Sequence, residues 1–353
     1  MKVFSFILGS ISCPSSRYRV YNYIKELNEG GICIKYSHFW GELYFKHVLG
    51  SRSKLLKVFM LFLYYPFCIM RRYISIFRII GFEVVHIERD FCPGFPVIGE
   101  WIIKKIFKKK LVYEYDDAVF LSDVPRGKTK KVIKMSDGVI AGNRYLGDYA
   151  KSYCKNTVCI PTSIDTTRYS IEKALAKAEN SKVVIGWIGS FSTLKYMELI
   201  KESLSRIAAE NDIELCIVCN KNLEWNTNIK IKNIPWGLET YLKAICRFDI
   251  GIMPLESTDW EKGKCGFKLI QYMGVGIPVV ASAVGVNNDL ISDSKNGFLA
   301  ESNEQWYHCL SKLINDVDLR NSMGEKGLAL VKERYSVQAN SAILIDFYKN
   351  IVE

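Results

Sequence analysis

The chain has 353 residues, of which 49% are hydrophobic, 24% charged and 13% aromatic. This composition, free of low-complexity tracts, excludes global disorder, and the length favours two domains. The 48 Lys and Arg residues exceed the 37 Asp and Glu residues and give a net charge of +11. Such an excess suggests an anionic partner: nucleic acid, a membrane surface or a phosphorylated ligand.

The eleven cysteines do not suggest a secreted disulfide framework or a metal site. They are scattered along a long chain, and Cys33, Cys216 and Cys219 lie in apolar strand-like runs. No second pair completes a zinc site with Cys216 and Cys219. We therefore expect reduced core cysteines in a cytosolic protein.

The sequence contains no segment typical of a leader peptide or membrane span. The apolar run at the amino terminus is too short for a signal peptide and has no small-residue cleavage site, so we expect a buried first strand there. The longest uncharged run, residues 58–70, is shorter than a transmembrane helix and contains Pro66.

Short apolar runs alternate with helical patterns in the first half of the chain. Strands are expected at residues 3–8, 33–36, 84–87, 111–115, 138–141 and 157–160. Helices are expected from Ser16 to Leu27, over 52–80 and over 101–107. The alternation predicts a parallel sheet with helices on both faces. The polar stretch 165–181 interrupts it, and we interpret this stretch as an interdomain linker.

The same rhythm restarts after this stretch. Strands are expected at residues 183–187, 214–218, 228–231, 249–253 and 278–282, and helices at 193–209, 238–246, 267–273 and from 304 onward. We therefore expect an α/β chain of two Rossmann-like, doubly wound domains facing across a cleft. In such sheets ligands bind at the carboxyl ends of the strands.

A small-residue loop follows the strand expected at 183–187. Gly189 and Ser190 end the strand, a helix is expected from Thr193, and Lys195 follows. Backbone N–H groups at the helix start could hold a phosphate, with Lys195 as a cation. Taken alone, the loop fits an ordinary strand-to-helix turn with a surface lysine better.

A second glycine-containing segment, residues 261–273, suits a diphosphate more closely. Glycines precede a helix, and Lys262, Lys264 and Lys268 crowd its start. The alternative is a solvated basic helix end. The buried strand expected at 278–282 argues against that alternative, because it places the segment at a carboxyl-end crevice.

Residues 262–285 resemble the nucleotide-sugar signature of the retaining, GT-B glycosyltransferases of family 4. The resemblance is specific in the second half of the chain and looser before residue 100. Further segments similar to that family are the donor-phosphate loop at 189–195, an IPNGVD-like segment at 160–165, a GFL strand at 297–299 and closing helices at 324–348.

The resemblance implies that different parts of the chain bind the acceptor and the donor. An acceptor domain is expected at 1–168, a nucleotide-sugar donor domain at 182–335, and a terminal helix, 336–353, packing back on the first domain. The implied donor-binding residues are Gly189, Ser190, Glu261, Lys264, Gly266, Phe267 and Gln271. The catalytic candidates are Asp116, Asp117, Lys195 and Lys268.

The sequence departs from the family pattern in the donor loops. Gly263 and Gln271 stand where the family usually has a Glu-x7-Glu pair, and Glu261 is the candidate replacement for the first glutamate. A glutamine can still bind a ribose as donor and acceptor. Ser190 replaces the usual arginine, so the expected cations for the diphosphate are Lys195, Lys264 and Lys268.

Two polar segments of the first half are further site candidates. Asp116 and Asp117 follow the strand 111–115, and paired acids there suit acid/base work or sugar binding, although helix capping accounts for one of them. Ser16, Arg17 and Arg19 resemble a segment found in part of the family, which implies an acceptor or phosphate role. The two arginines point apart on a helix, so we expect one at the surface.

Neither metal nor nucleic acid is expected as a partner. The four histidines, His38, His47, His86 and His308, lack ligand spacing, and His86 is interpreted as a satisfied core residue. Residues 54–78 and the lysines at 104–110 interleave basic with apolar residues. They fit docking on an anionic bilayer and a core helix beside a solvated charge run equally well. No nucleic-acid recognition motif is present.

These observations together predict a metal-independent glycosyltransferase, without a cofactor beyond its nucleotide-sugar substrate. Retention of the anomeric configuration is implied by the family resemblance alone. The acceptor is expected to be a glycan or lipid-linked, in bacterial surface-polysaccharide assembly at the inner face of the cytoplasmic membrane. Two alternatives stay open: a sugar-nucleotide 2-epimerase on the same plan, and a noncatalytic sugar-nucleotide-binding or membrane adaptor, which the missing glutamates favour.

Overall fold

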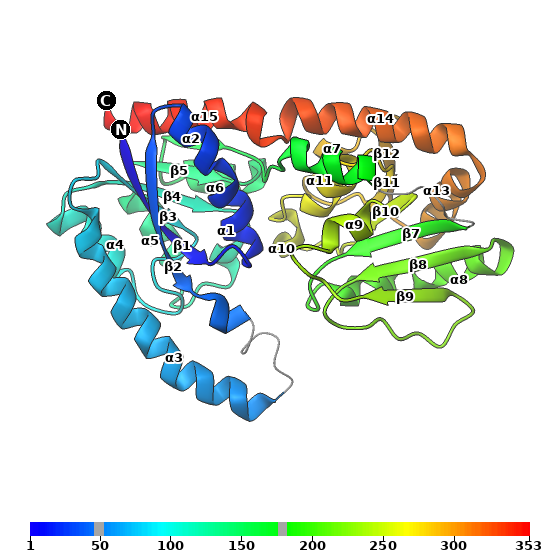
Figure 1. Cartoon of the computed structure of the whole chain (residues 1–353), viewed down its shortest axis with the longest axis horizontal. Coiled ribbons are helices and arrows are strands. Elements are labelled where there is room, and N and C mark those ends of the chain that lie inside the picture. Colours follow the sequence, from blue (N-terminus) through cyan, green and yellow to red (C-terminus); the bar gives the residue numbers. More distant parts are fainter. Residues whose placement is uncertain (46–52, 176–181) are drawn as a thin grey trace. The chain divides into compact units, whose positions relative to one another are not determined.

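The computed structural model describes residues 1–45, 53–175 and 182–353, which form two compact units. The first unit comprises Met1–Ser163, Gly263–Cys265 and Val337–Glu353; the second comprises Ile164–Lys262 and Gly266–Ser336. Each unit contains one six-stranded sheet whose neighbouring strands are parallel (Figure 1). The predicted α/β class with two Rossmann-like sheets is confirmed.

The sheet of the first unit has the order β2-β1-β3-β4-β5-β6. Its strands are β1 (Lys2–Gly9), β2 (Cys33–Trp40), β3 (Val84–Glu88), β4 (Lys110–Tyr115), β5 (Gly138–Ala141) and β6 (Thr157–Cys159). The chain passes from β1 to β2 on one side and then crosses to β3 on the other. The order therefore reverses between β1 and β3, and the loops after these strands flank the usual ligand position of such sheets.

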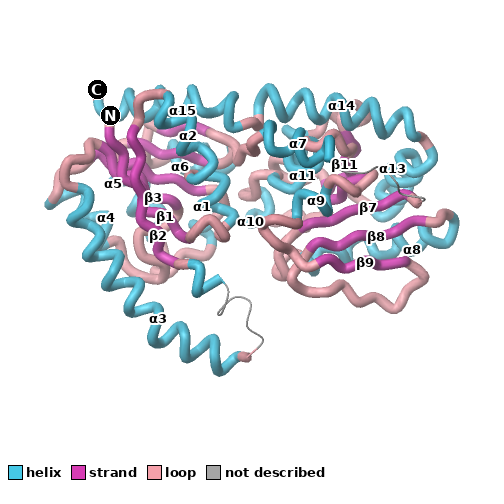
Figure 2. Tube along the Cα trace, viewed as in Figure 1, coloured by secondary structure: helices cyan, strands magenta, loops and turns pink. Residues whose placement is uncertain are grey.

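Helices cover both faces of this sheet, as Figure 2 shows. They are α1 (Pro14–Arg19), η1 (Tyr21–Tyr23), α2 (Ile24–Glu29), α3 (Lys54–Ile74), η3 (Ser75–Ile79), α4 (Ile98–Trp101), η4 (Ile102–Ile106), η5 (Val119–Leu121), α5 (Lys128–Met135), α6 (Arg144–Lys151) and α15 (Val337–Val352). The last of these, α15, packs on the first sheet: Leu344, Phe347 and Ile351 share one buried core with Val3 and Val84.

The second unit repeats the plan with the order β12-β11-β10-β7-β8-β9. Its strands are β7 (Val183–Ile188), β8 (Ile213–Val218), β9 (Lys230–Ile234), β10 (Ile250–Met253), β11 (Val279–Ser282) and β12 (Gly297–Ala300). The order reverses between β7 and β10, so the loops after these two strands flank the ligand position of this sheet.

The helices of the second unit alternate with these strands. They are α7 (Thr166–Leu175), η6 (Leu194–Ile200), α8 (Lys201–Glu210), α9 (Tyr241–Ile245), α10 (Asp259–Lys262), α11 (Phe267–Met273), α12 (Asn287–Leu290), α13 (Asn303–Asn315) and α14 (Val317–Arg334). The side chains that turn inward from η6, α8, α13 and α14 join the strands in one buried core.

Three sequence expectations about elements differ from the structure. The helix expected from Ser16 to Leu27 is broken into α1, η1 and α2, because Val20 leaves helical geometry with φ −125° and ψ −58°. The stretch 165–181 is not a plain linker: residues 166–175 form α7, and 176–181 lie outside the described residues. The helix expected over 193–209 begins as the 3₁₀-helix η6 before α8.

Two further features of the fold are the state of its cysteines and the lengths of its helices. All eleven cysteines, which lie within the described ranges, are free. Cys216 and Cys219 are buried as expected, whereas Cys33 is exposed, because it begins the edge strand β2. Within residues 1–45, 53–175 and 182–353, no helix has the length and apolar character needed to span a bilayer.

Candidate functional site

Glu88 is the centre of a polar cluster in the first unit, at the carboxyl ends of β1, β3 and β4. Its buried carboxylate accepts hydrogen bonds from the Leu8 N–H at 2.9 Å and the Ser16 hydroxyl at 2.6 Å. The Ser15 hydroxyl lies 2.6 Å from Glu88 Oε1 and 3.2 Å from Asp116 Oδ2. Ser15 therefore links the loop after β1 to the acids that follow β3 and β4.

A second carboxylate, Glu114 on β4, is fully enclosed beside this cluster. Arg19 Nε donates to Glu114 Oε1 at 2.7 Å, and His86 Nε2 lies 2.8 Å from Glu114 Oε2. Burial alone would raise the pKa of Glu114, but Arg19 and then His86 outweigh it and hold that pKa below its usual range. His86 also contacts Ser5 Oγ at 2.7 Å through Nδ1 and is only 1% exposed, so its predicted position in the core is confirmed.

Asp116 and Asp117 extend from the end of β4 and are both partly buried. Burial, together with the neighbouring negative charge of Asp117, raises the pKa of Asp116 to about 6, against the opposing charges of Arg89 and Arg19. Asp117 faces Arg89, with 3.5 Å between Oδ2 and Nη1. Asp116 therefore keeps its proton to a higher pH than an ordinary aspartic acid does.

The three residues expected to bind acceptor or phosphate are occupied within the protein. The Ser16 hydroxyl accepts a hydrogen bond from the Gly9 N–H and donates one to the Glu88 carboxylate. Arg19 Nη1 donates to the Ile160 carbonyl at 2.8 Å, in addition to its pairing with Glu114. The expectation that Arg17 or Arg19 lies at the surface is wrong, because both are only 3% exposed.

A short segment after α10 also belongs to the first unit. The Cys265 thiol donates to the Asp116 carbonyl at 3.1 Å, and Asn143 Nδ2 donates to the Lys264 carbonyl at 3.0 Å. Lys264, expected as a cation for the donor diphosphate, therefore has its main chain fixed beside the Asp116 loop. No pattern in the sequence predicts this attachment.

In the second unit, the two segments expected to hold phosphate lie side by side. The Lys268 ammonium of α11 lies 5.6 Å from the centre of the Trp187 ring on β7. A β-carbon at Gly189 would come within 2.9 Å of Lys268 Cε and 2.5 Å of Trp187, so a larger residue there would displace the Trp187 ring or the Lys268 side chain. This arrangement brings a lysine against the loop that follows β7, at the switch point of the sheet.

The start of α11 adds backbone donors to this region. Gly266 caps the helix with φ +63°, a conformation that favours glycine, and Phe267 is its first residue. Gln271, at the position of the family's second glutamate, is buried, and its Nε2 donates to Tyr169 of α7 at 3.0 Å. This contact explains why residues 166–175 fold with the second unit rather than acting as a linker.

Charged groups after β10 complete the site of the second unit. Lys195 Nζ lies 3.6 Å from Glu256 Oε2. The buried carboxylate of Glu261 accepts hydrogen bonds from the hydroxyls of Tyr196 and Thr258. Ser190, which replaces the family arginine, is exposed, and its Oγ lies 2.8 Å from that of Ser192.

Sequence reasoning missed several members of the two clusters. Glu88 and Arg89 directly follow the strand expected at 84–87, and Glu256 follows the one expected at 249–253. The rule that selected Asp116, a polar residue at the end of a buried strand, would have found all three. The same rule would not have found Glu114, because Glu114 lies inside its strand.

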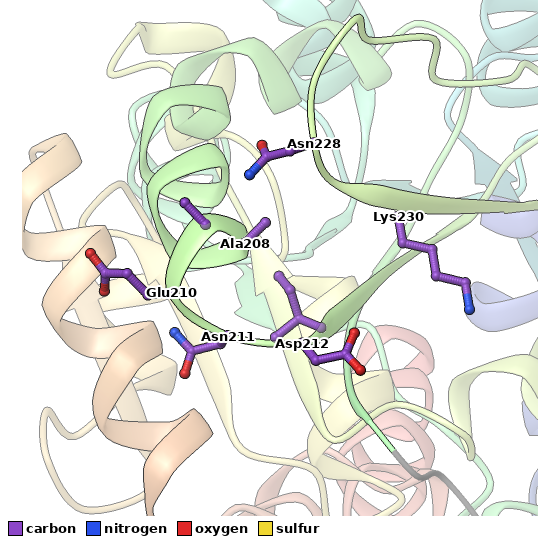
Figure 3. Close-up of a pocket in the computed structure, with 8 residues that line it drawn as sticks. Ala208, Glu210, Asn211, Asp212, Asn228 and Lys230 are labelled. Carbon is purple, nitrogen blue, oxygen red and sulfur yellow. The ribbon is translucent and has the colours of Figure 1, made fainter.

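A surface hollow of ≈ 370 Å³ lies elsewhere in the second unit (Figure 3). It is lined by Ala208, Ala209, Glu210, Asn211, Asp212, Ile213, Asn228 and Lys230. These residues lie at the amino ends of β8 and β9, opposite the loops that flank the switch point. We assign no function to this hollow, since ligands of such sheets bind at the carboxyl ends.

The described residues contain no group of three or more His, Cys, Asp or Glu side chains placed to hold a metal ion. His47 lies outside the described ranges. Trp236 is only partly buried and stacks on Tyr241 with 6.0 Å between ring centres.

Comparison with known sequences finds that part of the second unit is similar to a known family. Residues 182–316 match the family described as glycosyl transferases group 1. The D-inositol 3-phosphate glycosyltransferase of Paenarthrobacter aurescens is 30% identical over 106 residues, which make up 30% of this chain and 24% of that protein. The chain thus matches about a quarter of this curated relative's length.

Solved structures share the fold over nearly the whole chain. A glycosyltransferase of Rickettsia africae is 15% identical, covers 100% of this chain and 99% of its own, and gives a TM-score of 0.72. A sucrose-phosphate synthase of Thermosynechococcus elongatus is 13% identical with 99% of both chains covered and a TM-score of 0.71. Anabaena HepE, in complex with UDP, is 12% identical, covers 99% and 100%, and gives 0.68. Residues 182–316 are thus similar to the glycosyl transferases group 1 family, in a chain that has the GT-B fold.

Proposed function

We propose that this chain is a retaining glycosyltransferase that moves a sugar from a nucleotide-diphosphate sugar to an acceptor hydroxyl. The observation that supports this most strongly is the position of Lys268 against Gly189 and Trp187, within the group 1 domain. Anabaena HepE, which shares the fold, was solved with UDP and with UDP-glucose. We therefore propose a uridine nucleotide as the first donor to test.

The donor domain, 182–335, would hold the diphosphate by charge and by backbone donors. Lys268 and Lys195 supply the cations, and the N–H groups after Gly189 and Gly266 supply hydrogen bonds. As the bond between the sugar and the diphosphate breaks, negative charge grows on the phosphate oxygen. Fixed cations and N–H groups at that point lower the barrier without requiring a metal. The further donor contacts we propose are Ser190, Glu261, Lys264, Phe267 and Gln271.

The acceptor domain, 1–168, would present the hydroxyl that attacks the sugar. We assign Asp116 to this hydroxyl: the bond from the anomeric carbon to the diphosphate breaks, the acceptor oxygen bonds to that carbon on the same face, which retains the configuration, and Asp116 takes the hydroxyl proton. Burial, and then the charge of Asp117, which Arg89 holds, raise the pKa of Asp116. Ser16 and Arg19 are proposed as positioning residues, because they hold Glu88 and Glu114 from inside the unit. Arg17, which donates to the Ile11 carbonyl at 3.3 Å, holds the same loop, and the terminal helix 336–353 belongs with this domain.

The acceptor we propose is a lipid-linked glycan of bacterial surface-polysaccharide assembly. The chain would work as a cytoplasmic protein bound peripherally to the inner face of the membrane. Two sequence features support this location: the net charge of +11, and the absence of any acidic residue from position 43 to 82. Both favour an anionic surface.

A transfer assay tests the proposed reaction. The full chain would be incubated with radiolabelled UDP-glucose and a lipid extract of bacterial membranes, and label in the organic phase would be counted. NMR of the product would then give the anomeric configuration. We expect lipid-bound label with the donor's own configuration. Hydrolysis of the donor alone, with the same extract and a panel of other nucleotide sugars, would contradict the proposal.

A further inference from the structure

We propose that the first half of α3 inserts into the interface of an anionic bilayer, so that membrane binding depends on apolar contact as well as charge. A lipid-linked acceptor is the reason for the protein to bind a membrane through this surface, and in that respect the inference rests on the proposed function. Its evidence is independent of the donor site. α3 is the long helix whose first turns extend past the strands of the first unit (Figure 1).

The first three turns of α3 are apolar and exposed. Leu55 is 84% exposed, Phe62 78%, Val58 66% and Phe59 58%. Leu56, Leu61 and Leu63 are exposed as well. At about 100° per residue, these seven side chains occupy roughly 220° of the helix circumference. A helix that is apolar over most of its surface belongs in a protein core or in lipid, and among the residues that the structure describes these side chains are exposed rather than packed in a core.

The second half of α3 keeps this surface turned outward. Arg72 is buried and donates to the carbonyls of Ser37 and Ile7, at 2.7 and 2.5 Å. Arg71 donates to the carbonyls of His38 and Phe39, at 2.9 and 2.7 Å. These four bonds fix the helix to the ends of β1 and β2. The stripe that lies opposite Arg72 and continues from Phe59 and Leu63 consists of Phe67, Met70 and Ile74, each 48–61% exposed. Arg71 flanks this stripe, with its guanidinium 5.9 Å from the centre of the Phe67 ring.

The charges around this surface match an anionic bilayer. No acidic residue occurs between positions 43 and 82, whereas Lys54 and Lys57 lie on the exposed half of α3. Trp101 and Ile106, both exposed, precede the lysines at 108–110. Phe107 of this second segment contacts Phe77, just after α3, with 6.1 Å between ring centres. Tryptophan and lysine beside apolar side chains are typical of interfacial segments.

A bilayer fits these observations better than a second copy of the chain. A protein partner covers one face of a helix, whereas lipid can surround the whole apolar arc around the first turns. A second copy would also bring one run of positive charge against another. Anionic headgroups neutralise it instead. The occupant we infer is therefore a lipid interface with anionic headgroups, reached by a helix that lies in the plane of the membrane.

Vesicle flotation with the full chain tests this inference. The vesicles would contain phosphatidylglycerol and phosphatidylethanolamine, with pure phosphatidylcholine for comparison. We expect binding to the anionic vesicles that persists at about 1 M NaCl, where the Debye length is only about 3 Å. The double variant Phe59→Glu/Phe62→Glu should bind at least tenfold less. The matched control Ile171→Glu/Val317→Glu, two residues each 56% exposed on other helices, should bind within twofold of the wild type.

Two outcomes would overturn the inference. One is equal vesicle binding by the wild type and the Phe59→Glu/Phe62→Glu variant. The other is a wild-type dimer in sedimentation that this variant breaks while the wild type ignores vesicles, which would make a second copy the occupant. Thermal shift by UDP should be the same in the variant and the wild type. A failure of the proposed function would instead remove that shift from both.

Discussion

Lys268 is the residue on which the donor proposal depends most, since its ammonium lies beside the loop that follows β7. We expect Lys268→Ala to lower kcat about 10²–10³-fold, the usual effect of removing one fixed group that stabilises growing charge. Lys312→Ala is the matched control, because Lys312 lies over the Phe298 ring at a similar 5.7 Å but on α13. Steady-state rates of UDP release would measure both.

Equal rates for Lys268→Ala and the wild type would remove Lys268 from the mechanism. Nucleotide binding without any transfer by the wild type would instead favour the noncatalytic adaptor.

The pKa of Asp116 gives the reaction a testable pH dependence. A carboxylate that takes the acceptor proton must be ionised, so kcat/KM should fall as pH drops through about 6. Asp117→Asn removes the negative neighbour that raises this pKa and should move the acid limb to lower pH. Asp148→Asn, an exposed control on α6, should leave the limb in place. An acid limb that does not move in Asp117→Asn would contradict the assignment of Asp116.

The lowered pKa of Glu114 leads to a prediction about the stability of the fold rather than about the rate of the reaction. Its pKa is held below the ordinary value in the folded chain, so its ionised form stabilises the fold at neutral pH. Glu114→Gln leaves Arg19 buried without its counter-charge and should cost about 3–5 kcal/mol. Urea unfolding should show this difference in full at pH 7. The difference should shrink as pH falls below about 4.3, the usual glutamate value, and a constant difference would contradict the prediction.

At the residue scale, the sequence reveals the acids that end strands but not their neighbours. Asp116 and Asp117 stand out because polar groups follow a buried run. The burial of Ser16 and Arg19 depends on Glu88 and Glu114, which are 72 and 95 positions away along the chain. A single sequence contains no signal that joins such distant positions, so both residues looked like candidates for ligand contact.

At the scale of elements, hydrophobic periodicity predicts strands better than helix ends. β5 and α11 have the expected bounds, because their apolar runs are short and bounded by polar residues or glycine. The breaks between α1, η1 and α2 follow from backbone geometry at Val20, which no periodic pattern reports. α7 was missed because its burial comes from Tyr169, whose hydroxyl partner, Gln271, lies on another helix.

The packing of α15 on the sheet of the first unit leads to a prediction about the stability of the chain. Phe347 is 7% exposed in the core of the first unit, and a β-carbon at Gly138 would come within 2.7 Å of its ring. Phe347→Ala should therefore destabilise the chain by about 3–5 kcal/mol, measured by urea denaturation. Ile343→Ala, on the same helix but 45% exposed, should cost less than about 1 kcal/mol. Equal costs would show that α15 contributes no buried packing.

At the scale of the whole molecule, the alternation of strands and helices was enough to predict two Rossmann-like sheets. Parallel strands need crossover connections, and the spacing of the apolar runs supplies them. The assignment of Gly263–Cys265 to the first unit was not predictable, because it depends on the Cys265 thiol and on Asn143, which is 121 positions before its partner. Contact between distant segments is decided by the packed fold, not by local pattern.

The measurement that tests the central claim most directly is the thermal shift of the full chain with nucleoside diphosphates and nucleotide sugars, in the presence of EDTA. A ligand that binds only the folded state raises the melting temperature of the chain. At a ligand concentration 100 times Kd, it stabilises the folded state by about 2.7 kcal/mol. The account predicts a shift of several degrees with one nucleotide, UDP being the first choice. That shift should survive EDTA, disappear in Lys268→Ala and remain in Lys312→Ala. No shift with any nucleotide, or an equal shift in Lys268→Ala, would contradict a donor site built on α11 and the loop after β7.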